Sequence, residues 1–248
     1  MAEKQDKAFP ASAATRVPFA LALAALAGCA DSIGFLEYSQ LFMSFMSGNT
    51  TRFGVAVSSF DWENTARAAS TIVVFCFGAF LGTLLAAWVG PWRLPVLLSI
   101  EAALLAVGLI APWGSFSFPL HAYPIVLALG LQNATLQDAN GNSIALTYVT
   151  GAVVRFGTGL ANLVLHEPSP AFWLQAPLWG ALSTGAVIGG ALQIRYGENA
   201  FLFPAALAAG LAVVAIVLAL AKPRSPLVTG NAPAPDAPPH AKAVGMLR

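Results

Sequence analysis

Long apolar stretches, separated by short polar connections, leave few folds open to this chain. They run at residues 18–37, 40–60, 68–90, 94–111, 122–137, 144–165, 172–194 and 200–221. A helix crosses the hydrocarbon core of a bilayer with about 20 apolar residues, and the usual range is about 17–25. Only 9% of the residues are charged, against about 25% in a soluble domain. Because so few charges cannot cover the surface of a soluble protein, the sequence predicts an all-α, polytopic transmembrane helical bundle.

Charge and motif content exclude several classes of function. The formal net charge is +1 and the basic residues are scattered, so no nucleic-acid partner is predicted. Cys29 and Cys76 lie apart in apolar runs, and neither has a histidine or cysteine at metal-ligand spacing, so no metal or other cofactor is predicted. No zinc-hydrolase, nucleophile-elbow or phosphate-loop pattern occurs, and we therefore expect the chain not to be an enzyme.

A repeated phrase indicates where a site would lie. Segment 47–54 (SGNTTRFG) returns at 150–157 (TGAVVRFG), with the arginine and the Phe-Gly pair at the same spacing. An arginine is costly inside an apolar segment, so two at matching positions suggest a duplicated membrane protein built around a central site. The small and polar residues of the phrase are expected to interrupt the helices around that site.

The duplication extends beyond the phrase. Further matching pairs, first half and then second, are Gly28 and Gly130, Asp31 and Asn133, Gly78-x-x-x-Gly82 and Gly185-x-x-x-Gly189, Gly90 and Gly197, and Pro95 and Pro204. These pairs divide a single membrane domain, 17–221, into repeat one, 17–111, and repeat two, 122–221. The spaced glycines are typical of close helix packing.

Topology stays open between two counts. If every stretch spans the membrane, there are eight spans and the repeats run parallel. If the two interrupted stretches re-enter or merge with neighbours, there are about six spans, and three spans per half make the repeats inverted. We favour six. Basic residues before the first span and after the last one place both termini in the cytoplasm under either count.

The two ends of the chain are expected to be disordered. Residues 1–16 are polar, and residues 222–248 form a tail rich in proline and alanine. Residues 26–29 (LAGC) look like a lipoprotein cleavage box. We expect no cleavage there, because the apolar run continues past Cys29 and Gly28 and Asp31 have counterparts inside the chain.

Arg52 and Arg155 are the leading candidates for binding a solute. Each lies far from the next charge along its segment and so from the predicted membrane surface. A long side chain can reach that surface only from near a helix end, which explains Arg155 poorly and Arg52 only in part. One hypothesis is that both arginines face an internal cavity and bind an anionic or polar solute. The other is that carboxylates neutralise them and only fix the helix register, with Asp31, Glu101 and Asp138 as candidate partners.

Other polar residues complete the candidate substrate-binding set. Asp31 and Glu101 lie deep in apolar runs, and either could carry a proton or cation that couples to transport. Hydrogen-bonding groups would come from Ser47, Gly48, Asn49, Thr50, Thr150, Gly151 and Asn133. The first hypothesis for function is a small-solute transporter or permease with a polar site at the midplane between the repeats. The second is a non-catalytic membrane scaffold or lipid-interacting protein with structural ion pairs, and a homo-oligomer stays open.

Four segments resemble a known family. They are Gly28-x-x-Asp31-x-x-Gly34-Phe35, Ser44-Phe-Met-Ser-Gly-Asn-Thr-Thr-Arg52, Gly130-Leu-Gln-Asn-Ala134 and Thr147-Tyr-Val-Thr-Gly151. They resemble the YoaK-like family of bacterial inner-membrane proteins, and the resemblance covers about residues 18–220. It implies a multi-pass helical protein of the bacterial inner membrane with about six spans and no assigned function, and it supplies no site residues.

Overall fold

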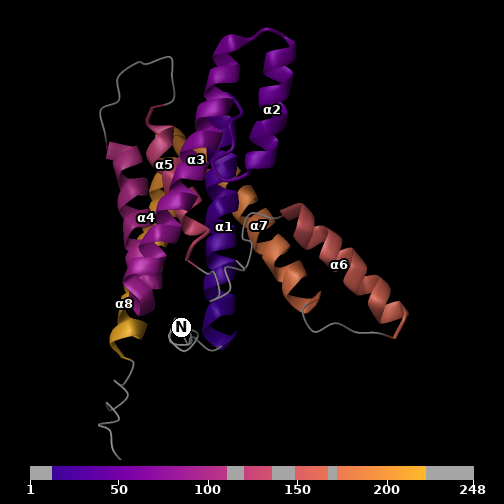
Figure 1. Ribbon diagram of the computed structural model, residues 1–248, viewed down its shortest axis with the longest axis vertical. Helices are drawn as coiled ribbons and strands as arrows, with labels where there is room; N and C mark the ends of the chain where they lie inside the picture. Colours follow the sequence, from indigo (N-terminus) through magenta and orange to yellow (C-terminus); the bar gives the residue numbers. More distant parts are fainter. Residues whose placement is uncertain (1–12, 111–119, 136–148, 167–171, 222–248) are drawn as a thin grey trace, which may run out of the picture.

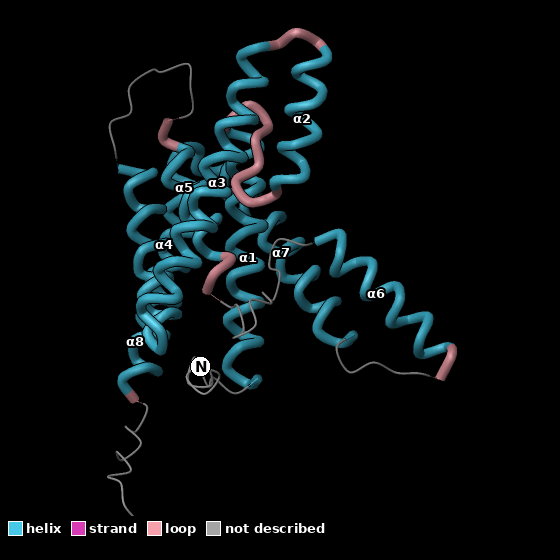
Figure 2. The backbone as a smooth tube through the Cα atoms, viewed as in Figure 1, coloured by secondary structure: helices cyan, strands magenta, loops and turns pink. Residues whose placement is uncertain are grey.

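All the regular structure in the described part of the chain is helical. The computed structural model describes residues 13–110, 120–135, 149–166 and 172–221, and Figure 2 shows helices joined by loops and no strand in these ranges. The prediction of an all-α protein is therefore confirmed. The predicted disordered tail, the polar turn that includes Asp138, and most of the predicted disordered N-terminus lie outside the described residues.

Eight α-helices and two short 3₁₀ helices make up the described part of the chain. The α-helices are α1 (Ala13–Glu37), α2 (Met46–Ser58), α3 (Trp62–Val89), α4 (Arg93–Ile110), α5 (Ala122–Gln132), α6 (Val149–Val164), α7 (Phe172–Tyr196) and α8 (Leu202–Leu220). The 3₁₀ helices η1 (Gly90–Trp92) and η2 (Gly197–Phe201) precede α4 and α8. Helix α1 begins earlier than the predicted boundary at residue 17.

Helices α1, α3, α4, α5, α7 and α8 form a bundle, and α2 and α6 pack on its outside (Figure 1). Among the described residues, three helical stretches are long and apolar enough to cross a membrane: Arg16–Glu37, Trp62–Leu109 and Asn199–Leu220. The second stretch contains both α3 and α4, which η1 separates at Gly90. The start of α1 and the end of α8 lie at the same end of the bundle (Figure 1).

Glycines allow α1 and α7 to pack with their backbones almost touching. A Cβ atom at Gly28 would lie 2.1 Å from the Leu182 carbonyl oxygen. On the facing helix, a Cβ at Gly185 would lie 2.0 Å from the Ala25 oxygen, and one at Gly189 would lie 2.3 Å from the Cys29 oxygen. Because the residue numbers rise together on the two helices, α1 and α7 run parallel. Here the spaced glycines act as packing surfaces, as the sequence indicated.

Helices α3 and α5 cross in the same way. A Cβ at Gly130 would lie 2.3 Å from the Phe75 carbonyl oxygen, and one at Gly78 would lie 2.3 Å from the Leu127 oxygen. These helices also run parallel, because a Cβ at Gly82 would approach the Leu131 oxygen, one turn further along both helices. Gly130, Gly78 and Gly82 are the residues that the sequence paired with Gly28, Gly185 and Gly189, respectively.

The repeated phrase does not interrupt its helix. Residues 47–54 continue as regular helix within α2, and the irregular backbone precedes them, between Glu37 and Met46. Two residues of that connection, Ser39 and Gln40, have positive φ angles of 50° and 64°. The expected break therefore lies about one turn before the small residues that predicted it. Thr50 and Thr51 donate to the carbonyls of Met46 and Ser47 one turn earlier, so their hydroxyls are satisfied without a break in the helix.

A short turn reverses the chain between α2 and α3. Asp61 caps α3 by accepting from the Asn64 backbone at 3.1 Å and from the Asn64 side chain at 2.6 Å. These hydrogen bonds hold the pKa of Asp61 below its ordinary value. Capping fixes the start of α3, so α2 folds back along it as a helical hairpin at one end of the molecule (Figure 1).

Candidate functional site

Asp31 of α1 caps the beginning of α2. Its Oδ1 accepts from the Ser44 backbone nitrogen at 2.6 Å and from the Phe45 nitrogen at 3.4 Å, and its Oδ2 accepts from Ser44 Oγ at 2.6 Å. The residue at the N-cap position of α2, Phe45, supplies no capping side chain of its own. A carboxylate is favourable at a helix N-terminus, where free N–H groups concentrate partial positive charge. Asp31 therefore fastens α2 and the preceding connection to α1.

Asn49 holds the same connection from the other side. It is fully buried, its Oδ1 accepts from the Phe42 nitrogen at 3.0 Å, and its Nδ2 donates to the Phe42 oxygen at 2.8 Å. One side-chain amide thereby satisfies both backbone polar groups of a residue outside regular structure. Asn49 is thus a structural clamp in this conformation, and its amide does not point into an open site.

Three phenylalanine rings gather beside Asp31. The Phe42 ring lies 5.1 Å from the Phe35 ring and 5.3 Å from the Phe45 ring, measured between ring centroids. Gly48 makes room for them, because a Cβ there would come within 2.5 Å of the Phe45 ring and 2.8 Å of the Phe42 ring. Glycine recurs at the same place in both copies of the phrase. In the first copy, at Gly48, the neighbouring rings leave no room for a larger side chain.

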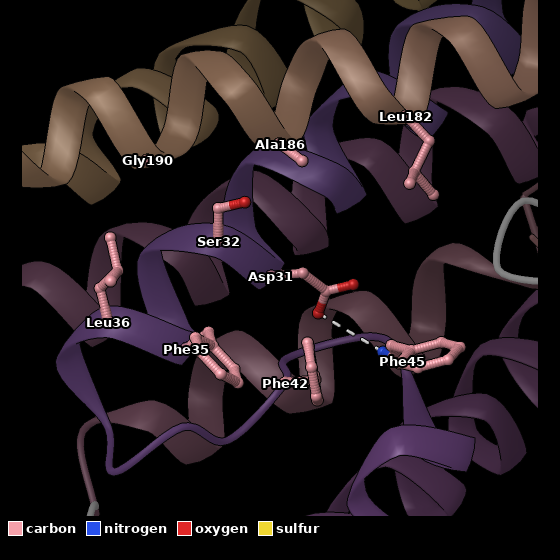
Figure 3. A pocket seen from close by; sticks show the side chains of 9 residues that line it. All are labelled: Asp31, Ser32, Phe35, Leu36, Phe42, Phe45, Leu182, Ala186 and Gly190. Carbon is pink, nitrogen blue, oxygen red and sulfur yellow. Dashed lines mark hydrogen bonds between the residues drawn. The ribbon is translucent and has the colours of Figure 1, made fainter.

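A pocket of about 500 Å³ opens between α1, the 42–45 segment and α7 (Figure 3). Its lining residues are Asp31, Ser32, Phe35, Leu36, Phe42, Phe45, Leu182, Ala186 and Gly190. Among them Asp31 is the one charged residue, and the rest of the wall is almost entirely apolar. In Figure 3 the Asp31 carboxylate lies between α1 and the loop, with the phenylalanine rings on the loop side and α7 opposite. Pockets of this size and character hold small organic molecules.

The two arginines of the repeated phrase lie apart in the structure. Arg52 is half-buried on α2 and donates to the Ser39 oxygen at 2.6 Å and to Gln40 Oε1 at 2.8 Å. Arg155 is exposed on α6 and donates from Nε to Gln175 Oε1 at 3.2 Å. Helices α2 and α6 occupy different places on the outside of the bundle (Figure 1). The structure therefore does not bring the two arginines to one cavity, and Arg52 contacts the strained Ser39–Gln40 turn instead of a carboxylate.

We expect Arg52→Ala to lower the free energy of unfolding by about 1–2 kcal/mol, because it removes two charge-assisted hydrogen bonds from that turn. Arg155→Ala should change it by about 0.5 kcal/mol or less, since its side chain is exposed and, among the described residues, makes one hydrogen bond, to Gln175. Unfolding of the purified protein in mixed micelles measures both. Equal losses in the two variants would contradict the assignment of Arg52 as a clamp on the turn.

The remaining candidate residues scatter over several elements. Ser47 and Thr50 are exposed on α2. Asn133 lies at the end of α5, where its amide donates to the carbonyls of Leu129 and Gly130. Gly151 lies in the first turn of α6, beside Thr150, whose side chain is outside the described part of the structure.

Glu101 lies in the core of the bundle, away from both arginines. It is fully buried on α4, and neither carboxylate oxygen has a hydrogen-bond partner among the described residues. It therefore pairs with neither of the arginines that the sequence proposed for it.

Sequence reasoning missed Ser44, Phe42 and Phe45 as members of the site. The signal was present, since a buried aspartate and a serine just ahead of a helix without its own cap are natural partners. The sequence does not show that α1 and the start of α2 lie side by side, and only that contact makes Asp31 a cap.

Comparisons with known proteins identify the family of this chain. Residues 19–214 match the model of the family described as "Protein of unknown function (DUF1275)". A UPF0700 transmembrane protein of Rhizobium meliloti (strain 1021) is 31% identical over 186 residues, which are 74% of this chain and 78% of that protein. No solved structure matches the chain. The narrower YoaK-like assignment stays a prediction. With its apolar helices and this transmembrane relative, the chain is an integral membrane protein, and it belongs to the DUF1275 family.

Proposed function

We propose that this protein is a permease for a small organic cation, and that the Asp31 pocket is its binding site. The observation that carries the proposal is one carboxylate in an otherwise apolar, partly aromatic pocket of about 500 Å³. Both halves of the chain build this pocket, since α1 and the 42–45 segment belong to the first repeat and α7 to the second. A site between two repeats is the usual arrangement in secondary transporters.

The chemistry of the lining favours an ammonium group with an apolar substituent. Aromatic faces attract cations, by about 0.5–2 kcal/mol or more per contact depending on desolvation. The donors that Asp31 accepts from, the Ser44 hydroxyl and the backbone N–H groups at the start of α2, are uncharged. They do not cancel the negative charge of the carboxylate, which can therefore attract a cationic ligand while it caps α2.

The anionic solute suggested by the sequence fits this pocket poorly. Among the described residues neither Arg52 nor Arg155 lines it, and a bound anion would face the Asp31 carboxylate. The alternative of a scaffold with purely structural polar groups draws support from Arg52 and Asn49, which hold the backbone of a loop. That alternative does not account for the pocket beside Asp31.

The arrangement of the repeats also supports a transporter. Helix α3 begins at the end of the bundle opposite to the start of α1 (Figure 1), and α5 runs parallel to α3. The first helix of one repeat therefore runs opposite to the first helix of the other. We propose an inverted repeat with three bundle helices in each half, an arrangement that permits alternating access by rocking of one half against the other.

The test uses benzyltrimethylammonium as the probe. The wild-type protein should bind it and should carry it into proteoliposomes that are negative inside. Asp31→Asn should weaken binding at least about tenfold, because a charge contact in a desolvated site contributes about 1.4 kcal/mol or more. The asparagine can still accept from the Ser44 and Phe45 nitrogens and donate to Ser44 Oγ, so the cap survives the substitution. Equilibrium binding and uptake of the labelled probe give the two readouts.

Asp61→Asn is the matched control. It also removes one negative charge and leaves a residue that caps a helix well, but it lies in the α2–α3 turn and does not line the pocket. It should bind and transport the probe as wild type does. Equal binding of benzenesulfonate, an anion of similar size, would contradict the assignment of a cation site. Folded wild-type protein that neither binds nor transports the cation would favour the scaffold.

A further inference from the structure

Glu101 is a charged residue type in a place that does not tolerate charge. It has no exposed surface, and both of its carboxylate oxygens lack a hydrogen-bond partner among the described residues. An isolated carboxylate in an apolar interior carries a large desolvation penalty. Its position is central: Leu94, Leu97, Leu98 and Leu105 are buried on the same helix at spacings that place Glu101 in the middle of their face.

A second unsatisfied group lies on the helix that faces Glu101. Gln132 of α5 is 2% exposed, and its Nε2 donates to the Leu23 oxygen at 2.9 Å while its Oε1 has no partner. Helices α4 and α5 run antiparallel, since Leu97 clusters with Leu131 near the start of α4, and a Cβ at Gly108 near its end would meet Ile125. This register places Glu101 opposite the last turn of α5, which ends at Gln132.

The charged neighbours do not neutralise Glu101. Several titratable or charged groups lie on α4 or on the elements packed against it. Those with described side chains are Glu63, Arg67 and Cys76 of α3, Tyr123 of α5, His121 before α5 and Arg93 at the start of α4 itself. The described residues of α8 include none. None of these groups bonds to Glu101 in the described structure, because both of its oxygens are without a partner.

The free oxygens suit a proton better than a metal ion. Glu101 and Gln132 offer three unpartnered oxygen atoms, whereas a hard cation such as Ca²⁺ takes about 6–8 oxygen ligands and Mg²⁺ about six. A proton needs one carboxylate oxygen, and it converts the carboxylate into a neutral group with an O–H donor. Gln132 Oε1, on the turn of α5 that lies opposite Glu101, is an acceptor that lacks a donor among the described residues.

We propose that Glu101 is a proton-binding residue of the bundle core, with Gln132 Oε1 as the acceptor toward which its protonated carboxyl donates. The proton attaches to one carboxylate oxygen in the closed bundle and leaves to water when a rearrangement hydrates α4. The site is separate from the Asp31 pocket, so it stands whether or not that pocket transports a cation. If the Asp31 pocket also transports a cation, protonation of Glu101 would couple that transport to a proton gradient, and only this coupling rests on the proposed function.

Infrared spectroscopy of the folded protein in lipid tests the proposal directly. A protonated carboxyl has a C=O stretch that a carboxylate lacks. We expect the wild type to show such a band at neutral pH, and Glu101→Gln to lack it. Glu63→Gln is the control, since Glu63 pairs with Arg67 on the exposed side of α3 and should leave the band unchanged. A spectrum of wild type without any protonated carboxyl band would overturn the proposal.

A second measurement needs no variant. Dicyclohexylcarbodiimide, a lipid-soluble reagent, reacts with protonated carboxyls, and peptide mapping of the wild-type protein then locates the adduct. We expect an adduct on Glu101 that increases as the pH falls. Modification of Glu101 by a water-soluble carbodiimide at neutral pH, without reaction of the lipid-soluble one, would show a hydrated carboxylate and would refute the assignment.

Discussion

Gly185→Ala should lower the free energy of unfolding by about 3 kcal/mol or more, the upper part of the range for overpacked cores. The added methyl group would lie 2.0 Å from the Ala25 carbonyl oxygen and within 2.8 Å of two further backbone atoms of that residue. A backbone atom cannot rotate away as the end of a side chain can, so α1 and α7 must separate. Reversible unfolding in mixed micelles measures the loss.

Gly180→Ala, on the same helix, is the matched control. A Cβ there meets no atom within 4 Å, and alanine is the better helix former by about 0.8–1 kcal/mol. Gly180→Ala should therefore leave stability unchanged or raise it slightly. If both variants lost the same stability, glycine flexibility and not helix contact would explain the data. Since α1 and α7 both line the Asp31 pocket, Gly185→Ala should also weaken binding of the probe cation.

The class of fold was readable from the sequence because it depends on local composition. Continuous apolar runs of about 20 residues fit membrane-spanning helices, whose backbone groups are satisfied internally, whereas barrel strands are shorter and alternate in polarity. The spaced glycines also predicted close packing correctly. The sequence could not say that Gly28 meets α7 or that Gly130 meets α3, because which helices pair is set by contacts far apart along the chain.

The candidate site was predicted less well, for a physical reason. The sequence drew attention to Arg52 because a charge in an apolar run is costly, but the cost falls away once the side chain reaches polar groups nearby. Arg52 finds the Ser39 carbonyl and Gln40 in the connection just before its helix. Asp31 similarly finds the free N–H groups at the start of α2. Short-range partners on the backbone give no signal in a search for opposite charges.

Glu101 shows the converse case. Its apolar neighbours on α4 made it suspicious in the sequence, and the structure leaves it buried and without a partner. The burial of Glu101 follows from the leucines at helical spacing around it, which is sequence information. Its placement opposite the last turn of α5, which ends at Gln132, follows from the antiparallel register of α4 and α5, and that register is not readable from the sequence. Only the second fact suggests where a proton on Glu101 would point.

Asn49→Ala should lower the free energy of unfolding by about 3 kcal/mol, because it leaves two backbone groups of Phe42 without partners and each such buried group costs about 1–3 kcal/mol. The amide is fully buried, so water cannot replace it without opening the loop. Asn49→Asp should be nearly as harmful, since it keeps the acceptor for the Phe42 nitrogen but removes the donor to the Phe42 oxygen. Thermal unfolding in detergent ranks the variants.

The neighbouring residue supplies the control for Asn49. Thr50 is exposed, and within the described ranges its hydroxyl bonds only to the Met46 carbonyl one turn earlier in the same helix. Thr50→Ala should change stability by about 0.5 kcal/mol or less. The loop that Asn49 clamps carries two of the three phenylalanines of the pocket, so Asn49→Ala should also reduce binding of benzyltrimethylammonium, and Thr50→Ala should not. Binding that survives in a destabilised Asn49→Ala protein would show that the pocket does not depend on this loop, and the assignment of Phe42 and Phe45 to the cation site would then be wrong.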